Sequence, residues 1–255
     1  MSKELSFDQF QNPFKFEDFI PLVNDRGLSK YQKIGFPDDY REGKEAFIFE
    51  DIVRKIDFDF ESKGKIFLDI GPGCSELPLM IQELCGKTET QLLLVDSKEM
   101  LDQLPDKEFV IKYEGFFPDA VPDLINSHQN KIDYIVAYSN LHSIFYDRCI
   151  YKFIDAALSM LKPGGKMLIG DIPNGTKRKR FFSSDTGIEF HKEFMKTNQD
   201  PVVTHYELEP GLIDDAVIIS ILQRYRHFGF ETYLLPQNAR LPMYNRREDI
   251  LICKT

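Results

Sequence analysis

The sequence predicts a single α/β domain, and three observations support that class. A chain of 255 residues with 42% hydrophobic content can bury one sizeable core. Within residues 65–86, an apolar strand ends in a glycine turn that opens a helix. Residues 91–96 form a second apolar strand that ends in an acid, Asp96. A strand, a turn, a helix and a second strand together indicate a sheet with helical crossovers.

The glycine turn follows from the residue types around it. Phe67 and Leu68 fit a buried strand, Gly71 and Gly73 let the backbone turn and approach a ligand, and Ser75 can cap the next helix. The apolar residues of that helix recur at helical spacing, and Gly86 is expected to end it. They are Leu77, Met80, Ile81, Leu84 and Cys85.

The acids near the turn indicate which cofactor it suits. In a dinucleotide site a helix N-terminus and bare amides receive an anionic pyrophosphate, beside which the carboxylate of Asp69 is unfavourable. A sulfonium cofactor with a free ammonium group reverses that preference, and Glu76 adds a second acid. Glycine also occurs in such turns for geometry alone, so a purely structural role stays open, as does a nicotinamide cofactor.

The second strand sharpens the cofactor prediction. Asp96 can accept both hydroxyls of a ribose, and Ser97 and Met100 follow where a ribose and an adenine face would lie. Here the chain resembles the class I S-adenosylmethionine-dependent methyltransferases. Residues 68–73 match their first motif and residues 94–96 their second, with Ser75 where a third glycine is common.

The resemblance implies a Rossmann-like, seven-stranded, mostly parallel sheet with helices on both faces and an antiparallel last strand. It also implies S-adenosylmethionine as cofactor, methyl transfer by direct displacement (EC 2.1.1.-) and no metal. The remaining elements fit this plan. Strands are expected at 108–113, 132–139, 166–171, 230–235 and 249–253, and helices at 45–56, 98–103, 150–161 and 214–228. A Lys-Pro-Gly-Gly turn at 162–165 ends one helix, and Gly229 ends another.

Further site residues follow from the resemblance. The loop of Gly115 and Phe116 is expected to hold the adenine, although a plain turn with core phenylalanines fits these residues equally well. Ser139, after the fourth strand, is expected beside the transferred methyl group. His142 is the candidate base, with a scaffold role as the alternative, and Asp171 is the candidate group that orients the acceptor or shares its proton.

A run of four cations after the fifth strand is the candidate for acceptor recognition. Lys177, Arg178, Arg180 and the nearby His191 would grip a phosphate or carboxylate, unless the run is a solvated basic loop. The C-terminal part, about 165–255, resembles methyltransferases of bacterial surface-polysaccharide biosynthesis. That likeness favours a phosphorylated or nucleotide-activated sugar as the small, anionic acceptor.

The domain plan has three parts. Residues 1–43 are expected to form an N-terminal lid or docking segment, residues 44–255 the methyltransferase domain, and about 174–212 a substrate-covering insertion. The first segment is rich in phenylalanine, and Tyr40 within it is a candidate cofactor contact. Its phenylalanines are Phe7, Phe10, Phe14, Phe16 and Phe19.

Composition excludes several other classes. A net charge of -9 argues against a broad nucleic-acid or membrane surface and favours a small-molecule partner. The four cysteines are scattered and lack zinc-ligand spacing, so no metal is expected. No apolar run approaches a membrane span, and the start lacks a signal-peptide core, which makes the cytoplasm the expected location. A non-catalytic cofactor-binding protein and a macromolecular methyltransferase remain as rivals, and the oligomeric state is not predicted.

Overall fold

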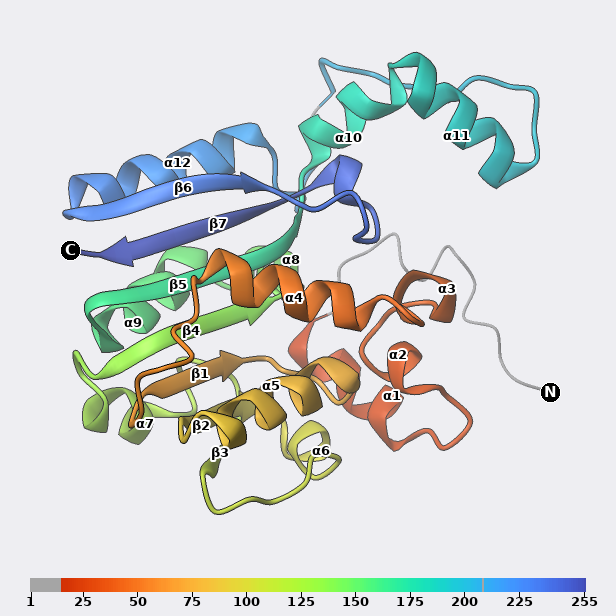
Figure 1. Cartoon of the computed structure of the whole chain (residues 1–255). Helices are drawn as coiled ribbons and strands as arrows, with labels where there is room; N and C mark the ends of the chain where they lie inside the picture. The colour runs from red at the N-terminus through yellow and green to blue at the C-terminus, as the bar shows by residue number, and fades with distance from the viewer. Residues whose placement is uncertain (1–14, 208) are drawn as a thin grey trace.

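A computed structural model describes residues 15–207 and 209–255, and its centre is one seven-stranded sheet (Figure 1). The strand order is β3-β2-β1-β4-β5-β7-β6. Strands β1 to β5 are parallel, and β7 runs antiparallel between β5 and β6. The predicted α/β class, sheet and antiparallel last strand are confirmed. The strands are β1 Ile66–Ile70, β2 Gln91–Asp96, β3 Val110–Glu114, β4 Ile132–Tyr138, β5 Leu161–Pro173, β6 Phe230–Pro236 and β7 Arg247–Lys254.

Helices cover both faces of the sheet, and each face has its own apolar core. On one face α4 and α5 pack with inward residues such as Phe67 and Leu92, and on the other α7, α8, α9 and α12 pack with residues such as Leu68 and Ile135. Side chains alternate between the two faces along each strand. These helices are α4 Glu45–Lys55, α5 Glu76–Lys87, α6 Lys98–Leu101, α7 Pro122–Ser127, α8 Leu141–Asp147, α9 Ile150–Met160 and α12 Asp215–His227.

The described part of the N-terminal segment lies at the carboxyl ends of the central strands. It consists of short helices, which we call the cap, residues 15–43. They are η2 Phe16–Asp18, α1 Phe19–Asn24, α2 Lys30–Lys33 and α3 Asp38–Arg41. Phe7, Phe10 and Phe14 lie outside the described residues, so the lid assigned to residues 1–43 stays a prediction.

Two helices that the sequence did not predict follow β5. Helices α10 (Gly175–Phe182) and α11 (Asp185–Met195) stand out from the body as a two-helix arm (Figure 1). Their shared contact is a set of phenylalanine rings, with centroids of Phe181 and Phe190 5.8 Å apart. Residues 177–180 are therefore helical and not a loop, because Asn174 caps a helix there by accepting from the Lys177 amide at 3.0 Å. Arg178 and Arg180 are nevertheless exposed, as expected for a solvated basic run.

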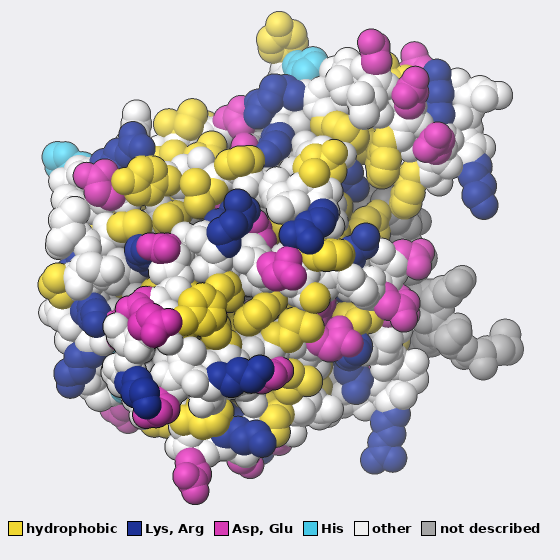
Figure 2. All heavy atoms as spheres, viewed as in Figure 1, with side chains coloured by type: hydrophobic (Ala, Val, Ile, Leu, Met, Phe, Trp, Pro, Cys, Tyr) yellow, Lys and Arg dark blue, Asp and Glu magenta, His cyan; other side chains and the backbone are white. Residues whose placement is uncertain are grey.

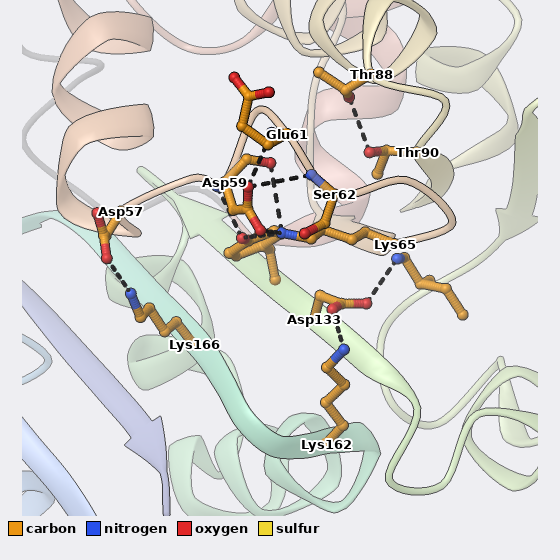
Figure 3. Close-up of polar contacts among 12 residues, drawn as sticks. Asp57, Asp59, Glu61, Ser62, Lys65, Thr88, Thr90, Asp133, Lys162 and Lys166 are labelled. Carbon is orange, nitrogen blue, oxygen red and sulfur yellow. Dashed lines mark hydrogen bonds and ion pairs between the residues drawn. The ribbon is translucent and has the colours of Figure 1, made fainter.

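The opposite edge of the sheet, at the amino ends of β1 and β4, is closed by paired charges (Figure 3). Asp133 accepts from the Ile66 amide at 2.9 Å and pairs with Lys162. The Lys65 ammonium group lies 2.6 Å from an Asp59 oxygen. Because these polar groups satisfy one another, we interpret this edge as scaffold.

Two local predictions need correction. Gly86 does not end α5, which runs to Lys87; the ring of Phe109 packs where a Cβ at Gly86 would come within 2.9 Å of it, so the glycine serves close packing. Ser75 occupies the N-cap position of α5, but its side chain accepts no capping hydrogen bond. Glu45 of α4 takes that role by accepting from the Leu77 amide at 2.7 Å.

Candidate functional site

A cavity opens at the carboxyl ends of β1, β2, β3 and β4, beneath the cap. Its floor is the turn after β1, and its walls are mostly apolar. In open α/β sheets, ligands bind at this edge. Seven of the predicted site residues line the cavity: Gly71, Gly73, Asp96, Met100, Gly115, Phe116 and Ser139.

The turn itself requires glycine at two positions. Gly71 has φ +71° and Gly73 has φ +67°, in the left-handed region. A Cβ at Gly71 would lie 2.7 Å from the side-chain nitrogen of Asn140, and a Cβ at Gly73 would lie 2.7 Å from the cap residue Ile34. Neither position therefore has room for a side chain.

Asp96, at the end of β2, is joined to the turn by hydrogen bonds. Its two carboxylate oxygens accept from the Gly73 amide at 2.9 Å and from the Ser97 amide at 2.7 Å. Burial raises the pKa of Asp96 to about 6, although these two amides act to lower it. Ser97 caps α6 by accepting from the Met100 amide at 3.3 Å, which brings Met100 to the cavity wall.

Asp69 is not among the described residues that line the cavity. It is 3% exposed and faces the α5 side of the sheet, whereas its neighbour Ile70 faces the cavity. Burial, followed by the charge of Asp96, raises the pKa of Asp69 to about 8. Successive side chains of a strand point to opposite faces of the sheet, so Asp69 and its neighbour Ile70 lie on different faces. Direct contact of Asp69 with a bound cation stays a prediction.

The predicted adenine loop forms one wall. Gly115 has φ +122°, and its amide donates to the Asp96 carbonyl at 2.8 Å, which fixes the loop to β2. The Phe116 ring meets the cap residue Phe16 edge-to-face at 5.3 Å, and the Arg148 guanidinium lies 4.6 Å from its centroid. The ring of Phe116 thus links the cap to the wall of the cavity.

The cap contributes residues that the sequence did not single out. Ile34, Phe36 and Arg41 line the cavity along with Phe16 and Phe19, whereas the candidate contact Tyr40 is not among the described lining residues. The cap is held on α5 by Glu76, which accepts from Tyr31 at 2.6 Å and pairs with Lys30. Glu76 was expected to favour a cationic cofactor, but it is a tether for the cap.

A cluster of buried charges lies at the ends of β4 and β5. One oxygen of Asp171 accepts from Ser139 and contacts two arginines, Arg41 at 3.3 Å and Arg247 at 2.9 Å. Ser139 and Asp171 both have positive φ, +61° and +57°. Gln237 donates to the other Asp171 oxygen at 3.3 Å. Asp171 therefore positions Ser139 and Arg41, and it is not among the described residues that line the cavity.

His142 is the second residue of α8, also outside the described lining of the cavity. Its Nδ1 atom is buried and has no hydrogen-bond partner among the described residues. Burial, then the charge of Arg247, lowers the pKa of His142 to about 4. The imidazole is neutral at physiological pH and a weaker base than an ordinary histidine, and its catalytic role stays a prediction.

The predicted anion clamp is not assembled at the cavity. Three of its members have a carboxylate partner: Lys177 pairs with Glu248, Arg178 with Glu209 and Arg180 with Asp215. Arg178 and His191 line a separate hollow on the arm. These side chains lie away from the described cavity lining, and their role in binding an anionic acceptor stays a prediction.

The described residues also contain neither a candidate metal centre nor a candidate membrane span. No group of three or more of their side chains could hold a metal ion. Within the same residues, no helix combines the length and apolarity needed to cross a bilayer. On the face shown in Figure 2, basic and acidic side chains of the described residues are interspersed.

Comparisons with known proteins agree with the fold. No family model and no curated protein matches the sequence. Among solved structures, the chain is similar to the CurJ carbon methyltransferase (TM-score 0.56, 15% identity, 94% of this chain and 65% of that one). It is also similar to a SAM-dependent methyltransferase from Aquifex aeolicus (TM-score 0.51, 14% identity, 88% and 95%).

A third neighbour is phosphoethanolamine N-methyltransferase 2 of Haemonchus contortus in complex with S-adenosyl-L-methionine (TM-score 0.53, 14% identity, 92% and 60%). The chain thus spans less than two thirds of the first and third of these neighbours. The shared feature is the fold: the chain has the class I fold of S-adenosylmethionine-dependent methyltransferases.

Proposed function

We propose that this chain is an S-adenosylmethionine-dependent methyltransferase acting on a small acceptor. The observation that carries the proposal is one cavity in which the bare turn of Gly71 and Gly73 lies directly beside the buried carboxylate of Asp96. The fold is that of known methyltransferases, including one with S-adenosyl-L-methionine bound.

The cavity residues fit that cofactor. Asp96 uses one lone pair of each oxygen on backbone amides, which leaves others for two ribose hydroxyls. Met100 and Phe116 supply apolar walls for an adenine, and Asn140 presents a buried Oδ1 atom that has no partner among the described residues. That oxygen suits a donor such as an ammonium group.

S-adenosylmethionine supplies an electrophilic methyl group, which an acceptor nucleophile can take by direct displacement. The protein then has to align the acceptor and exclude water, and a base adds only where the acceptor must lose a proton. Ser139 and Arg41 lie at the ends of β4 and β5, where that alignment would occur, and Asp171 holds both. His142 remains the candidate base of the proposal.

The acceptor is proposed to be small and anionic, as for a phosphorylated or nucleotide-activated sugar. Lys177 to Arg180 do not support this choice, because their charges are paired with acids. The resemblance of residues 165–255 to polysaccharide-pathway methyltransferases favours a sugar precursor. Arg41, a cation in the cavity lining, favours an anion.

Two measurements test the function. An NAD-dependent oxidoreductase also binds a ribose through an acid, so NAD is the ligand to compare. Isothermal titration calorimetry should show that S-adenosylhomocysteine binds more tightly than NAD. Incubation with methyl-labelled S-adenosylmethionine and a fractionated small-molecule extract should yield a labelled product and S-adenosylhomocysteine. Tighter binding of NAD would favour the oxidoreductase. Cofactor binding without any labelled product from small-molecule, protein or RNA fractions would favour a non-catalytic protein.

A further inference from the structure

Arg41 is the one cation among the described residues that line the cavity. It is 3% exposed and comes from α3 of the cap, and its Nη2 atom donates to Ser139 at 2.5 Å and to Asp171 at 3.3 Å. Its guanidinium plane lies over the Phe36 ring at 4.1 Å. These contacts fix the position of the guanidinium at the edge of the cavity.

Two nitrogen atoms of the same guanidinium remain available. Nε and Nη1 of Arg41 make no hydrogen bond to any residue that the structure describes, although Arg41 lines the cavity. Arginine carries five N–H donors, and hydrogen bonds from a guanidinium to an oxyanion are strengthened by charge. Both two-pronged edges of the guanidinium include Nη2, which donates to Ser139 and Asp171, so Nε and Nη1 each offer separate hydrogen bonds. Neither atom is among the buried polar atoms without a partner in the described residues, so both are open to a ligand oxygen in the cavity.

The local charge also favours an anion. Asp171 is the acidic group next to Arg41, and it is shared with a second buried arginine, Arg247, at 2.9 Å. Two positive charges therefore face one carboxylate beside the cavity. The compensating acids lie farther along the network, where Lys55 sits between Asp51 and Asp249. The end of that network nearest the cavity has a surplus of one positive charge.

The position of Arg41 separates it from the ribose end of the cavity. The ribose acid Asp96 ends β2 and the glycine turn ends β1, whereas the partners of Arg41, Ser139 and Asp171, follow β4 and the end of β5. Neighbouring strands lie about 4.8 Å apart, so Arg41 is roughly 10–15 Å from the strand of Asp96. That places it beyond the turn, where either the acceptor or the methionine part of the cofactor can reach it, and the tests below separate the two.

We propose that Arg41 binds an oxyanion, a carboxylate or phosphate, on the methyl acceptor through N–H donors of its guanidinium that Ser139 and Asp171 leave free. This inference rests on the proposed function and names the acceptor class for it. The atom that receives the methyl group is a different one on the same molecule, because the oxyanion is engaged by the guanidinium. The methylated product therefore keeps its negative charge.

The first test uses the unaltered full-length chain with labelled S-adenosylmethionine and a small-molecule extract. On an anion-exchange column at pH 7.5, the labelled product is expected to be retained and to elute with salt. Labelled product in the flow-through would overturn the inference.

The second test compares Arg41→Gln with Arg240→Gln. Arg240 is a matched control because it also pairs with an acid, Glu50 at 3.0 Å, and lies over a ring, Phe47 at 4.5 Å, on the exposed surface. Arg41→Gln should lower labelled product at least tenfold at a fixed extract concentration, with S-adenosylhomocysteine affinity changed by less than about threefold. Arg240→Gln should match the unaltered protein in both.

Two cofactor analogues test the competing interpretation, in which Arg41 binds the carboxylate of the cofactor's methionine part. If Arg41→Gln weakens S-adenosylhomocysteine more than tenfold and leaves 5′-methylthioadenosine unchanged, Arg41 holds that carboxylate and the inference is wrong. If Arg41→Gln does not fold, Arg41→Lys keeps the charge beside Asp171 and loses the additional planar N–H donors, and it should show the same selective loss of product. Failure of the unaltered protein to bind S-adenosylhomocysteine would remove the proposed function, and the inference with it.

Discussion

Replacement of Asp96 by alanine is expected to weaken S-adenosylhomocysteine binding by about 1–3 kcal/mol, or roughly 5- to 150-fold in Kd. Asp96 is 8% exposed and lines the cavity, where its carboxylate accepts from the Gly73 amide. Two charge-assisted hydrogen bonds to a ribose would be lost, offset in part by the desolvation cost that the carboxylate already bears when buried.

The assay is isothermal titration calorimetry at pH 8, above the pKa of about 6 for Asp96, so that the carboxylate is ionised. Asp96→Asn is the companion variant, because an amide keeps one acceptor for the turn and loses the charge. Glu114→Gln is the matched control, since Glu114 pairs with Asp96 in the strand register but its side chain is largely exposed. Equal affinity in the unaltered protein and in both Asp96 variants would remove Asp96 from the site.

Three further predictions concern the turn and its neighbours. Asp69→Asn should stabilise the free protein at pH 8 but not at pH 4. The pKa of Asp69 is raised to about 8 in the folded protein, so the unaltered protein loses stability as the pH rises from about 4 toward 8, by up to about 1.4 kcal/mol for each pH unit. Urea unfolding that shows the same pH dependence in both proteins would contradict this. Gly71→Ala should lower the free energy of unfolding in the same assay by about 1 kcal/mol or more beyond the loss in Gly64→Ala. Both glycines have positive φ, but only Gly71 has a close neighbour, the side chain of Asn140. Equal losses would mean that the close approach is unimportant. His142→Ala should slow methyl transfer and leave cofactor affinity nearly intact if His142 is the base, and with its pKa lowered to about 4 the rate of the unaltered enzyme should be flat from pH 6 to 8 with respect to this group; an unchanged rate in the variant would return His142 to the scaffold.

The sequence was informative where a pattern is local. The strands that end at Ile70 and Asp96 and the glycine turn between them were predictable, because apolar runs and glycines report on their own backbone. Strict alternation along the first strand also accounts for the place of Asp69. Alternation along residues 66–70 puts Asp69 on the face opposite Ile70, so an acid beside a turn need not point into the cavity.

The parts that the sequence did not predict depend on distant partners. Arg41 lies in a stretch without a clear period, and its partners Ser139 and Asp171 are 98 and 130 residues away. Nothing in the local sequence distinguishes it from a surface arginine. The surroundings of the basic run at 177–180 were not predictable for the converse reason, because the acids that pair with it, among them Glu209 and Asp215, come later in the chain.

A crystal structure of the chain with S-adenosylhomocysteine tests the central claim most directly. The ribose hydroxyls are expected on the Asp96 carboxylate, the adenine between Met100 and Phe116, and the amino-acid part along the backbone of Gly71 and Gly73. A crystal in which this cavity is filled by side chains, or in which the compound binds elsewhere, would contradict the claim.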